Sequence, residues 1–299
     1  MSRTVEEIGR KMDALGLWGL LSKFNFAVRP RGTVLPYFCT ALKEDGSPVK
    51  VRFLMLEGWQ TLHDFVRVRV DGSFGYYTSP MEMPHLELVV AENGEMRLFR
   101  HDPGYMPLEA KEPWVSLAVK ILWEAYGVML RLESDAQLPL CYAEQKAVFA
   151  RVEQPDGSWT DEPLVIPDPP PYAERIVIPK ELAKQVKDLP LVQDDVLIVD
   201  FRLMPEIMTK EPRPRCVYGL FARDMKTQRL VLDCRVSASP EAGLKGMWES
   251  MPVQVLHGLA RLGKVPGEIH VRSPRVFRML RPICIELPLK LRLRDKLKI

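Results

Sequence analysis

Arginine recurs at every third position near the C-terminal end of the sequence, starting at Arg272. Ser273-Pro274 is a typical helix start, with Ser as the N-cap and Pro at the first helical position. On a helix that begins there, the next three arginines fall on one arc, and apolar side chains occupy the opposite side. Guanidinium groups pair well with phosphate, and a helix N-terminus adds free N–H donors. The pattern predicts an anion-binding surface made of Arg272, Ser273, Arg275, Arg278, Arg281, Arg292 and Arg294.

The charge of the whole chain is distributed unevenly. Its 299 residues have a formal net charge of only +3. Residues 201–299 hold 20 Lys and Arg against 9 Asp and Glu, whereas the rest of the chain has an excess of eight acidic residues. This asymmetry favours an anionic partner for the C-terminal part, with nucleic acid or another polyanion as the candidate. The alternative is an ordinary solvated face, or two halves of opposite charge that attract each other.

The histidines give a weaker indication of chemistry. His85 and Glu87 would share one face of a strand and could both bind a metal, but no second pair at metal spacing accompanies them. A surface or hydrogen-bonded role is therefore favoured for each histidine. The sequence contains no nucleophile elbow, phosphate-binding loop or dinucleotide fingerprint. We accordingly predict no cofactor.

The N-terminal half is expected to be an antiparallel sheet with a few helices. Residues 4–24 have helical spacing of apolar positions, and alternating side chains predict a strand over 65–70. Hairpins are predicted around residues 43–48, at Asn93-Gly94 and at 155–157. Another helix should run from Pro113 to about residue 126. Three consecutive prolines at 169–171 then indicate a linker, which divides the chain into domains at 1–170 and 171–299.

The C-terminal domain shows a clear series of elements. A continuous apolar strand at 196–203 is followed by a hairpin over 215–237. A long amphipathic helix begins at Ser239 and should end at Gly263. A short strand, the arginine-bearing helix to residue 280 and a last strand at 288–293 complete the series, with Pro282 expected to stop the helix.

The order strand–strand–strand–helix–strand–helix–strand resembles the ribonuclease H-like fold of integrase and transposase cores. The same stretch resembles an uncharacterised bacterial domain family, in which a strand like 267–271 follows a turn like Gly263-Lys264-Val265-Pro266. The resemblance implies a three-layer α/β domain with a mixed sheet, so the predicted class combines α/β and α+β.

The ribonuclease H-like resemblance also implies where metal-binding acids would lie in a catalytic member. Asp200 lies in the expected first strand, where the family has its first metal-binding acid. Arg272 stands where the second acid is expected, and the following helix contains no acid up to residue 280. The implied protein is therefore a non-catalytic binding protein. Two alternatives stay open: a metal-dependent nuclease or phosphoesterase that uses Asp200 with acids such as Asp224 or Asp233, and a protein-interaction or self-assembly module.

Cysteine usage and hydropathy indicate the compartment. The five cysteines are odd in number and lack a Cys-x-x-Cys pair, which favours reduced thiols over a disulfide framework or zinc site. No export signal and no membrane-spanning apolar run is visible. We therefore predict a cytoplasmic protein that does not associate with membranes.

Overall fold

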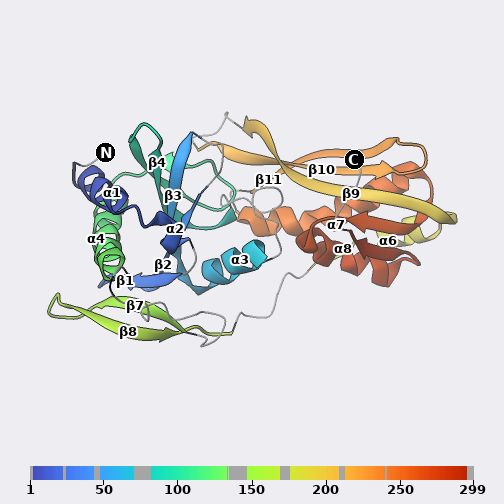
Figure 1. Ribbon diagram of the computed structural model, residues 1–299. Helices are drawn as coiled ribbons and strands as arrows, with labels where there is room; N and C mark the ends of the chain where they lie inside the picture. Colours follow the sequence, from blue (N-terminus) through green and yellow to red (C-terminus); the bar gives the residue numbers. More distant parts are fainter. Residues whose placement is uncertain are drawn as a thin grey trace. The chain divides into compact units, whose positions relative to one another are not determined.

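The computed structural model describes residues 3–22, 25–43, 48–70, 82–132, 134, 147–168, 176–208, 213–239 and 241–294. The chain separates into two compact units. The first comprises residues 1–70, 83–102 and 107–171, and the second runs from 172 to the C-terminus and also includes Glu82 and residues 103–106. The predicted combination of helices and mixed sheets is confirmed, since each unit is built around one sheet (Figure 1).

The N-terminal unit contains an eight-stranded sheet in the order β6-β5-β4-β3-β2-β1-β7-β8. The strands are β1 (Phe26–Arg29), β2 (Tyr37–Leu42), β3 (Val49–Glu57), β4 (His85–Ala91), β5 (Met96–His101), β6 (Leu108–Glu109), β7 (Ala147–Glu153) and β8 (Trp159–Val165). All neighbours pair antiparallel except β1 and β7, which are parallel. The predicted hairpins β2–β3, β4–β5 and β7–β8 are confirmed.

Two helices pack against apolar side chains that the strands present on one face of this sheet. Helices α1 (Arg3–Leu15) and α4 (Trp114–Leu132) pack on a core with Leu86, Leu88 and Val90 of β4. His85 and Glu87, which alternate with these residues on β4, are also buried and point to the other side of the strand. This strand is thus covered on both sides, and polar groups lie on one of them.

Two sequence predictions in this unit are wrong. Residues 65–70, predicted as a strand from alternating side chains, belong to helix α3 (Gly58–Val70). The buried side chains of Leu62 and Phe65 lie one helical turn apart, and their burial outweighs the strand-like alternation. The single helix expected over 4–24 is divided into α1 and α2 (Trp18–Leu21), because Gly16 adopts a left-handed conformation with φ of 67° that ends the first helix.

The C-terminal unit contains a five-stranded sheet in the order β11-β10-β9-β12-β13. The strands are β9 (Leu191–Met208), β10 (Arg215–Asp224), β11 (Leu230–Ser237), β12 (Val265–Val271) and β13 (Lys290–Leu293). The first three strands pair antiparallel, whereas β12 is parallel to both β9 and β13. Strand β9 therefore lies at the centre, between an antiparallel and a parallel half.

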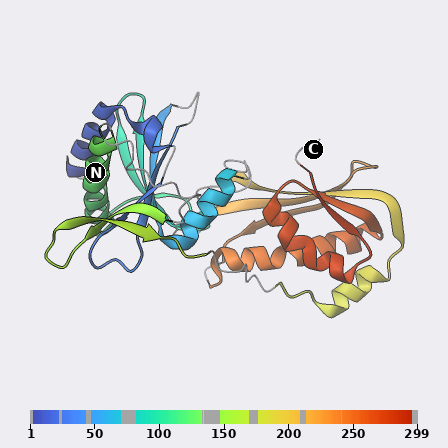
Figure 2. The same ribbon diagram turned by 60° about the horizontal axis from the view of Figure 1, so that its bottom comes forward.

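Three helices cover one face of this sheet: α6 (Lys180–Lys187), α7 (Gly243–Leu262) and α8 (Pro274–Glu286), as Figures 1 and 2 show. Their apolar stripes share one core with Leu197, Val199 and Phe201 of β9. The described part of this unit has two layers, where the sequence predicts three. We call the face of the sheet opposite the helices the outer face.

The helix boundaries in this unit differ from the predicted ones. Helix α8 does not stop at Pro282 but continues to Glu286. A proline removes one backbone hydrogen bond, and the complete burial of Ile283 one residue later favours continuing the helix. Helix α7 begins at Gly243 instead of Ser239, although the Ser239 hydroxyl still accepts a hydrogen bond from the Ala242 backbone N–H at 2.8 Å. Its predicted end at Gly263 is confirmed, with a left-handed φ of 74°.

The longest helices are α4 and α7, with 19 and 20 residues. Neither these nor any other helix in the described ranges combines the length and apolar character needed to cross a membrane.

Candidate functional site

Strand alternation determines which side chains of the C-terminal sheet reach its outer face. Since Leu197, Val199 and Phe201 point into the helix-covered core, the residues between them on β9 point outward. In the register of β9 and β10, Asp200 lies opposite Phe221, and Arg202 lies opposite Gly219. The outer face therefore carries charged and aromatic side chains at the centre of the sheet.

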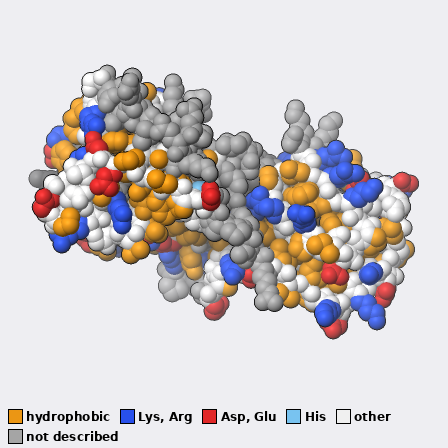
Figure 3. Space-filling view, turned by 90° about the horizontal axis from the view of Figure 1, so that it is seen from below, with side chains coloured by type: hydrophobic (Ala, Val, Ile, Leu, Met, Phe, Trp, Pro, Cys, Tyr) orange, Lys and Arg blue, Asp and Glu red, His pale blue; other side chains and the backbone are white. Residues whose placement is uncertain are grey.

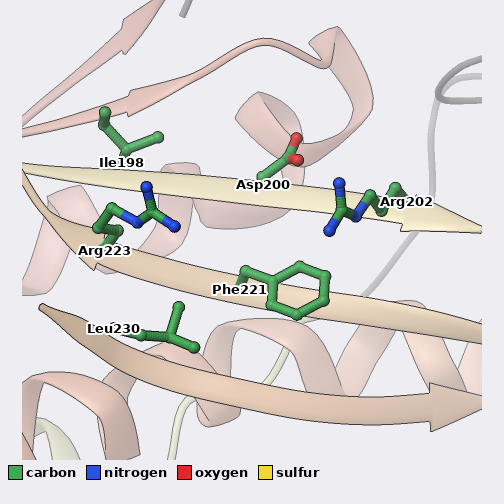
Figure 4. A pocket seen from close by; sticks show the side chains of 6 residues that line it. All are labelled: Ile198, Asp200, Arg202, Phe221, Arg223 and Leu230. Carbon is green, nitrogen blue, oxygen red and sulfur yellow. The ribbon is translucent and has the colours of Figure 1, made fainter. Parts of the chain in front are cut away.

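A cavity of about 200 Å³ opens at this place on the outer face. Figure 4 shows its lining side chains rising from three adjacent strands. They are Ile198, Asp200 and Arg202 from β9, Phe221 and Arg223 from β10, and Leu230 from β11. Besides the carboxylate of Asp200, which pairs with Arg272, the cavity combines two guanidinium groups with an aromatic ring and two aliphatic side chains. The cationic, aromatic and aliphatic groups suit an anionic ligand that has a flat or apolar part.

Gly219 makes room for the aromatic ring at this site. A Cβ atom at this position would lie 2.4 Å from the Phe221 ring, so only glycine lets the ring lie over the backbone of β10. The guanidinium groups of Arg202 and Arg235 lie over the same ring, 4.9 Å and 5.2 Å from its centroid. The ring thus holds cationic groups beside the cavity by cation–π attraction.

Arg202 and Arg223 differ from the other arginines of this face. In the described part of the chain neither makes a hydrogen bond or ion pair with a carboxylate, and the Nε of Arg223 is buried without a hydrogen-bond partner. Their cross-strand neighbours explain this, because Arg202 lies opposite Gly219 and Arg223 lies opposite Ile198. These two cationic groups are available to an incoming anion.

The acidic residues weighed for a metal site are each held by a different cation. Asp200 is buried and accepts a hydrogen bond from Nη2 of Arg272 at 3.0 Å. Asp233 pairs with Arg235. Within the described residues, the cluster of His, Cys, Asp and Glu side chains close enough to share a metal includes none of these acids. This geometry favours a structural role for Asp200.

Asp224 belongs to a separate buried group. Lys264 bridges Asp195 and Asp224, with 2.8 Å between its Nζ and Oδ2 of Asp224. Burial alone would raise the pKa of Asp224, but the ammonium group and the backbone N–H of Thr227 outweigh burial and lower it below the ordinary value. Hydrogen bonds to Asp195 and then to Asp224 raise the pKa of Lys264. This arrangement keeps Asp224 and Lys264 charged near neutral pH.

Several arginines of the predicted anion-binding surface are also neutralised within the unit. Arg275 pairs with the buried Glu82 and lies over the Trp248 ring at 4.8 Å. Arg292 pairs with Glu268 at 3.3 Å, and Arg272 with Asp200. The structure therefore uses these three predicted site residues for internal pairing.

The remaining members of that surface do not converge on one cavity. The hydroxyl of Ser273 caps α8 by accepting a hydrogen bond from the Val276 backbone N–H at 3.4 Å. Arg278 is half-buried, whereas Arg281 and Arg294 are exposed. On the face drawn in Figure 3, Lys and Arg side chains of the C-terminal unit are interspersed with apolar and acidic ones. The helix surface is less concentrated than the arginine spacing predicts.

Among the residues that line the outer cavity, only Asp200 is a candidate predicted from the sequence. Phe221, which lies in the sequence Phe-Ala-Arg of β10, is not among the predicted site residues. The available signal was the alternation Ile198, Asp200, Arg202 within a strand otherwise read as continuously apolar. Polar residues at every second position of a central strand indicate a face that is not part of the core.

Comparison with known proteins finds a family match in the C-terminal unit and no activity. Residues 182–299 match the family described as a domain of unknown function, DUF6930. The match begins in α6 and includes all of the five-stranded sheet. No curated protein matches the chain.

Proposed function

We propose that the C-terminal unit binds an anionic partner through the outer cavity, and that this partner is single-stranded nucleic acid. The observation that carries the proposal is a pair of guanidinium groups beside an aromatic ring, those of Arg202 and Arg223, which pair with no carboxylate among the residues that the structure describes. Guanidinium groups bind phosphate, and their planes, which for Arg202 and Arg235 lie over the Phe221 ring, also offer a surface on which a base can stack.

The size of the cavity favours a polymer over a small molecule. Pockets that enclose a whole small ligand typically measure about 300–1,000 Å³, and this cavity of about 200 Å³ suits one group of a larger partner. Arg235 extends the basic character along the same face toward β11, although it already pairs with Glu206 and Asp233. The excess of positive charge in residues 201–299 supports the same choice.

Fluorescence anisotropy with a labelled single-stranded oligonucleotide tests this function at several salt concentrations. The variant Arg202→Met/Arg223→Met should bind at least tenfold more weakly at low salt. Because two phosphate contacts are lost, the slope of log K against log salt should fall by about 1.4. Arg261→Met is the matched control, since it removes an exposed arginine from the end of α7.

A further variant, Arg278→Met/Arg281→Met, distinguishes the outer cavity from the helix surface that the sequence predicted. It should bind as tightly as the wild type. The proposal fails if the wild type shows no binding at low salt, or if the sheet and helix variants lose affinity equally.

We further propose that this unit is a ribonuclease H-like scaffold without catalytic activity. Support comes from the element order, from the central position of β9 and from the parallel addition of β12 and β13. The pairing of Asp200 with Arg272 favours the absence of catalysis. Incubation with nucleic acid and Mn²⁺ should give no cleavage, and cleavage abolished by Asp200→Asn would refute this proposal.

A cytoplasmic location is part of the same proposal. It is supported by Cys39, Cys216, Cys234 and Cys284, which are free thiols.

A further inference from the structure

Two histidines and a glutamate of the N-terminal unit lie together within its sheet. His85 of β4 is the register partner of His101 of β5, and Glu87 follows two residues later on the same face of β4. The exposed fractions of His85, Glu87 and His101 are 2%, 2% and 3%. Three side chains that carry metal-ligating atoms are therefore buried at neighbouring positions.

Hydrogen bonds determine which ring nitrogen of each histidine carries its proton. Nδ1 of His85 lies 2.8 Å from the Met83 carbonyl oxygen, which can only accept, so Nδ1 is the donor. Nε2 of His101 lies 2.6 Å from Oε2 of Glu87, whose other oxygen accepts a hydrogen bond from Arg52 at 2.9 Å. Glu87 is thus an ionised acceptor, and Nε2 of His101 donates to it. These two contacts fix the orientation of both rings.

The opposite nitrogen of each ring lies on the side away from these contacts. Nε2 of His85 and Nδ1 of His101 are buried, and neither makes a hydrogen bond with any residue that the structure describes. Leaving a buried acceptor unsatisfied is costly, and native structures do so rarely. Two such atoms on adjacent, stacked rings are close enough to share one ligand.

We propose that His85 and His101 bind a transition-metal ion of the zinc class. Histidines that ligate metals donate their other N–H to a carboxylate or a backbone carbonyl, and here one does each. One ligand atom from each histidine and one from Glu87 all lie within 4.8 Å of one another. Neutral imidazole nitrogens suit zinc, copper and nickel, whereas magnesium and calcium prefer oxygen ligands.

Metal binding requires a defined local rearrangement. The rings are stacked with centroids 4.0 Å apart and an angle of 16° between their planes. A metal lies in the plane of each imidazole that binds it, at about 2.0–2.1 Å from the nitrogen, so the rings must turn out of the stack. Glu87, which accepts a hydrogen bond from Nε2 of His101, is the positioning residue for that ring.

A buried water is the competing occupant, because it could donate hydrogen bonds to both bare nitrogens. The experiment that separates the two uses the full chain, freed of metal by a chelator and labelled with ¹⁵N in histidine. One equivalent of Zn²⁺ should shift the bare ¹⁵N resonances of His85 and His101. Unmoved resonances after Zn²⁺ addition would mean water, and the proposal would be overturned.

Calorimetry with Zn²⁺ provides the second measurement. The variants His85→Gln and His101→Gln should each lose one bound equivalent relative to the wild type. His257→Gln, which removes an exposed histidine of α7, should keep it. Glu87→Gln should weaken binding by about 10–100-fold, as expected when a group that orients a ligand is altered. Unchanged stoichiometry in both histidine variants would contradict the site, and the wild-type resonances decide the matter if those variants do not fold.

Discussion

Replacing Arg272 with Met would remove the partner of a carboxylate that the C-terminal sheet shields from solvent. Only 5% of Asp200 is exposed, and its Oδ2 accepts a hydrogen bond from Arg272 at 3.0 Å. Methionine keeps most of the aliphatic length of arginine and removes the charge. The variant therefore removes the guanidinium group that pairs with Asp200.

The structure sets the expected size of this effect. Removing one member of a buried ion pair typically costs about 3–5 kcal/mol, because the remaining charge is uncompensated. Asp200 also lines the outer cavity, which can admit water to its carboxylate. We therefore expect a loss of about 3 kcal/mol in the free energy of unfolding, near the lower end of that range. For a unit of this size the loss corresponds to a fall of about 10 °C in melting temperature.

Urea and thermal unfolding of the full chain, followed by circular dichroism, would measure the change. The double variant Arg272→Met/Asp200→Asn removes the charge as well, so it should recover to within about 1 kcal/mol of the wild type. Arg261→Met, an exposed control, should stay within about 0.5 kcal/mol. If Arg272→Met is neutral, or the double variant is no more stable than the single one, Asp200 is not held as a structural ion pair.

Three further predictions concern the same unit. Lys264→Met should cost about 3–5 kcal/mol in unfolding free energy, because it leaves Asp195 and Asp224 buried without their cation; a smaller cost than that of an exposed lysine substitution would refute the pairing. The folded-state pKa of Asp224 is lowered and that of Lys264 is raised. The stabilisation that this pair gives the folded state should therefore be lost as the pH falls below about 4 and as it rises above about 10.5. The difference in unfolding free energy between wild type and Lys264→Met should accordingly shrink in acid. Gly219→Ala should cost about 1–3 kcal/mol in urea unfolding, because its Cβ displaces the Phe221 ring, and Gly219→Ala/Phe221→Ala should then lose no more than Phe221→Ala alone.

Local signals in the sequence were sufficient for most of the strands. A turn such as Asn93-Gly94 sits between alternating segments only four residues apart, so the chain itself brings β4 and β5 into register. The strand predicted within α3 is wrong because the local signal there is misleading. Alternating Val and Arg at 66–70 satisfies the strand pattern, and only burial against β2 and β3 selects the helix.

Candidate sites were harder to predict than elements, because pairing depends on contacts between distant residues. The arginine spacing correctly predicted the helix that carries Arg275, yet its partner Glu82 lies 193 residues earlier in the chain. His85 and Glu87 were recognised as a face-sharing pair, but His101 joins them only through the β4–β5 register. The sequence shows which groups can do chemistry, whereas the fold decides which of them are already occupied.

Strand register decides which positive charges of the C-terminal unit are free to bind. Arg272 follows Val271, whose partner across the strands is Val199, and this places it beside Asp200. Arg202 and Arg223 instead face a glycine and an isoleucine, which cannot neutralise them. A shift of one residue between β9 and β10 would place the outward side chains of β9 opposite residues of β10 that point into the core. A net excess of basic residues is therefore a weak guide to a binding surface, and a stronger one is an arginine whose cross-strand neighbours carry no acid.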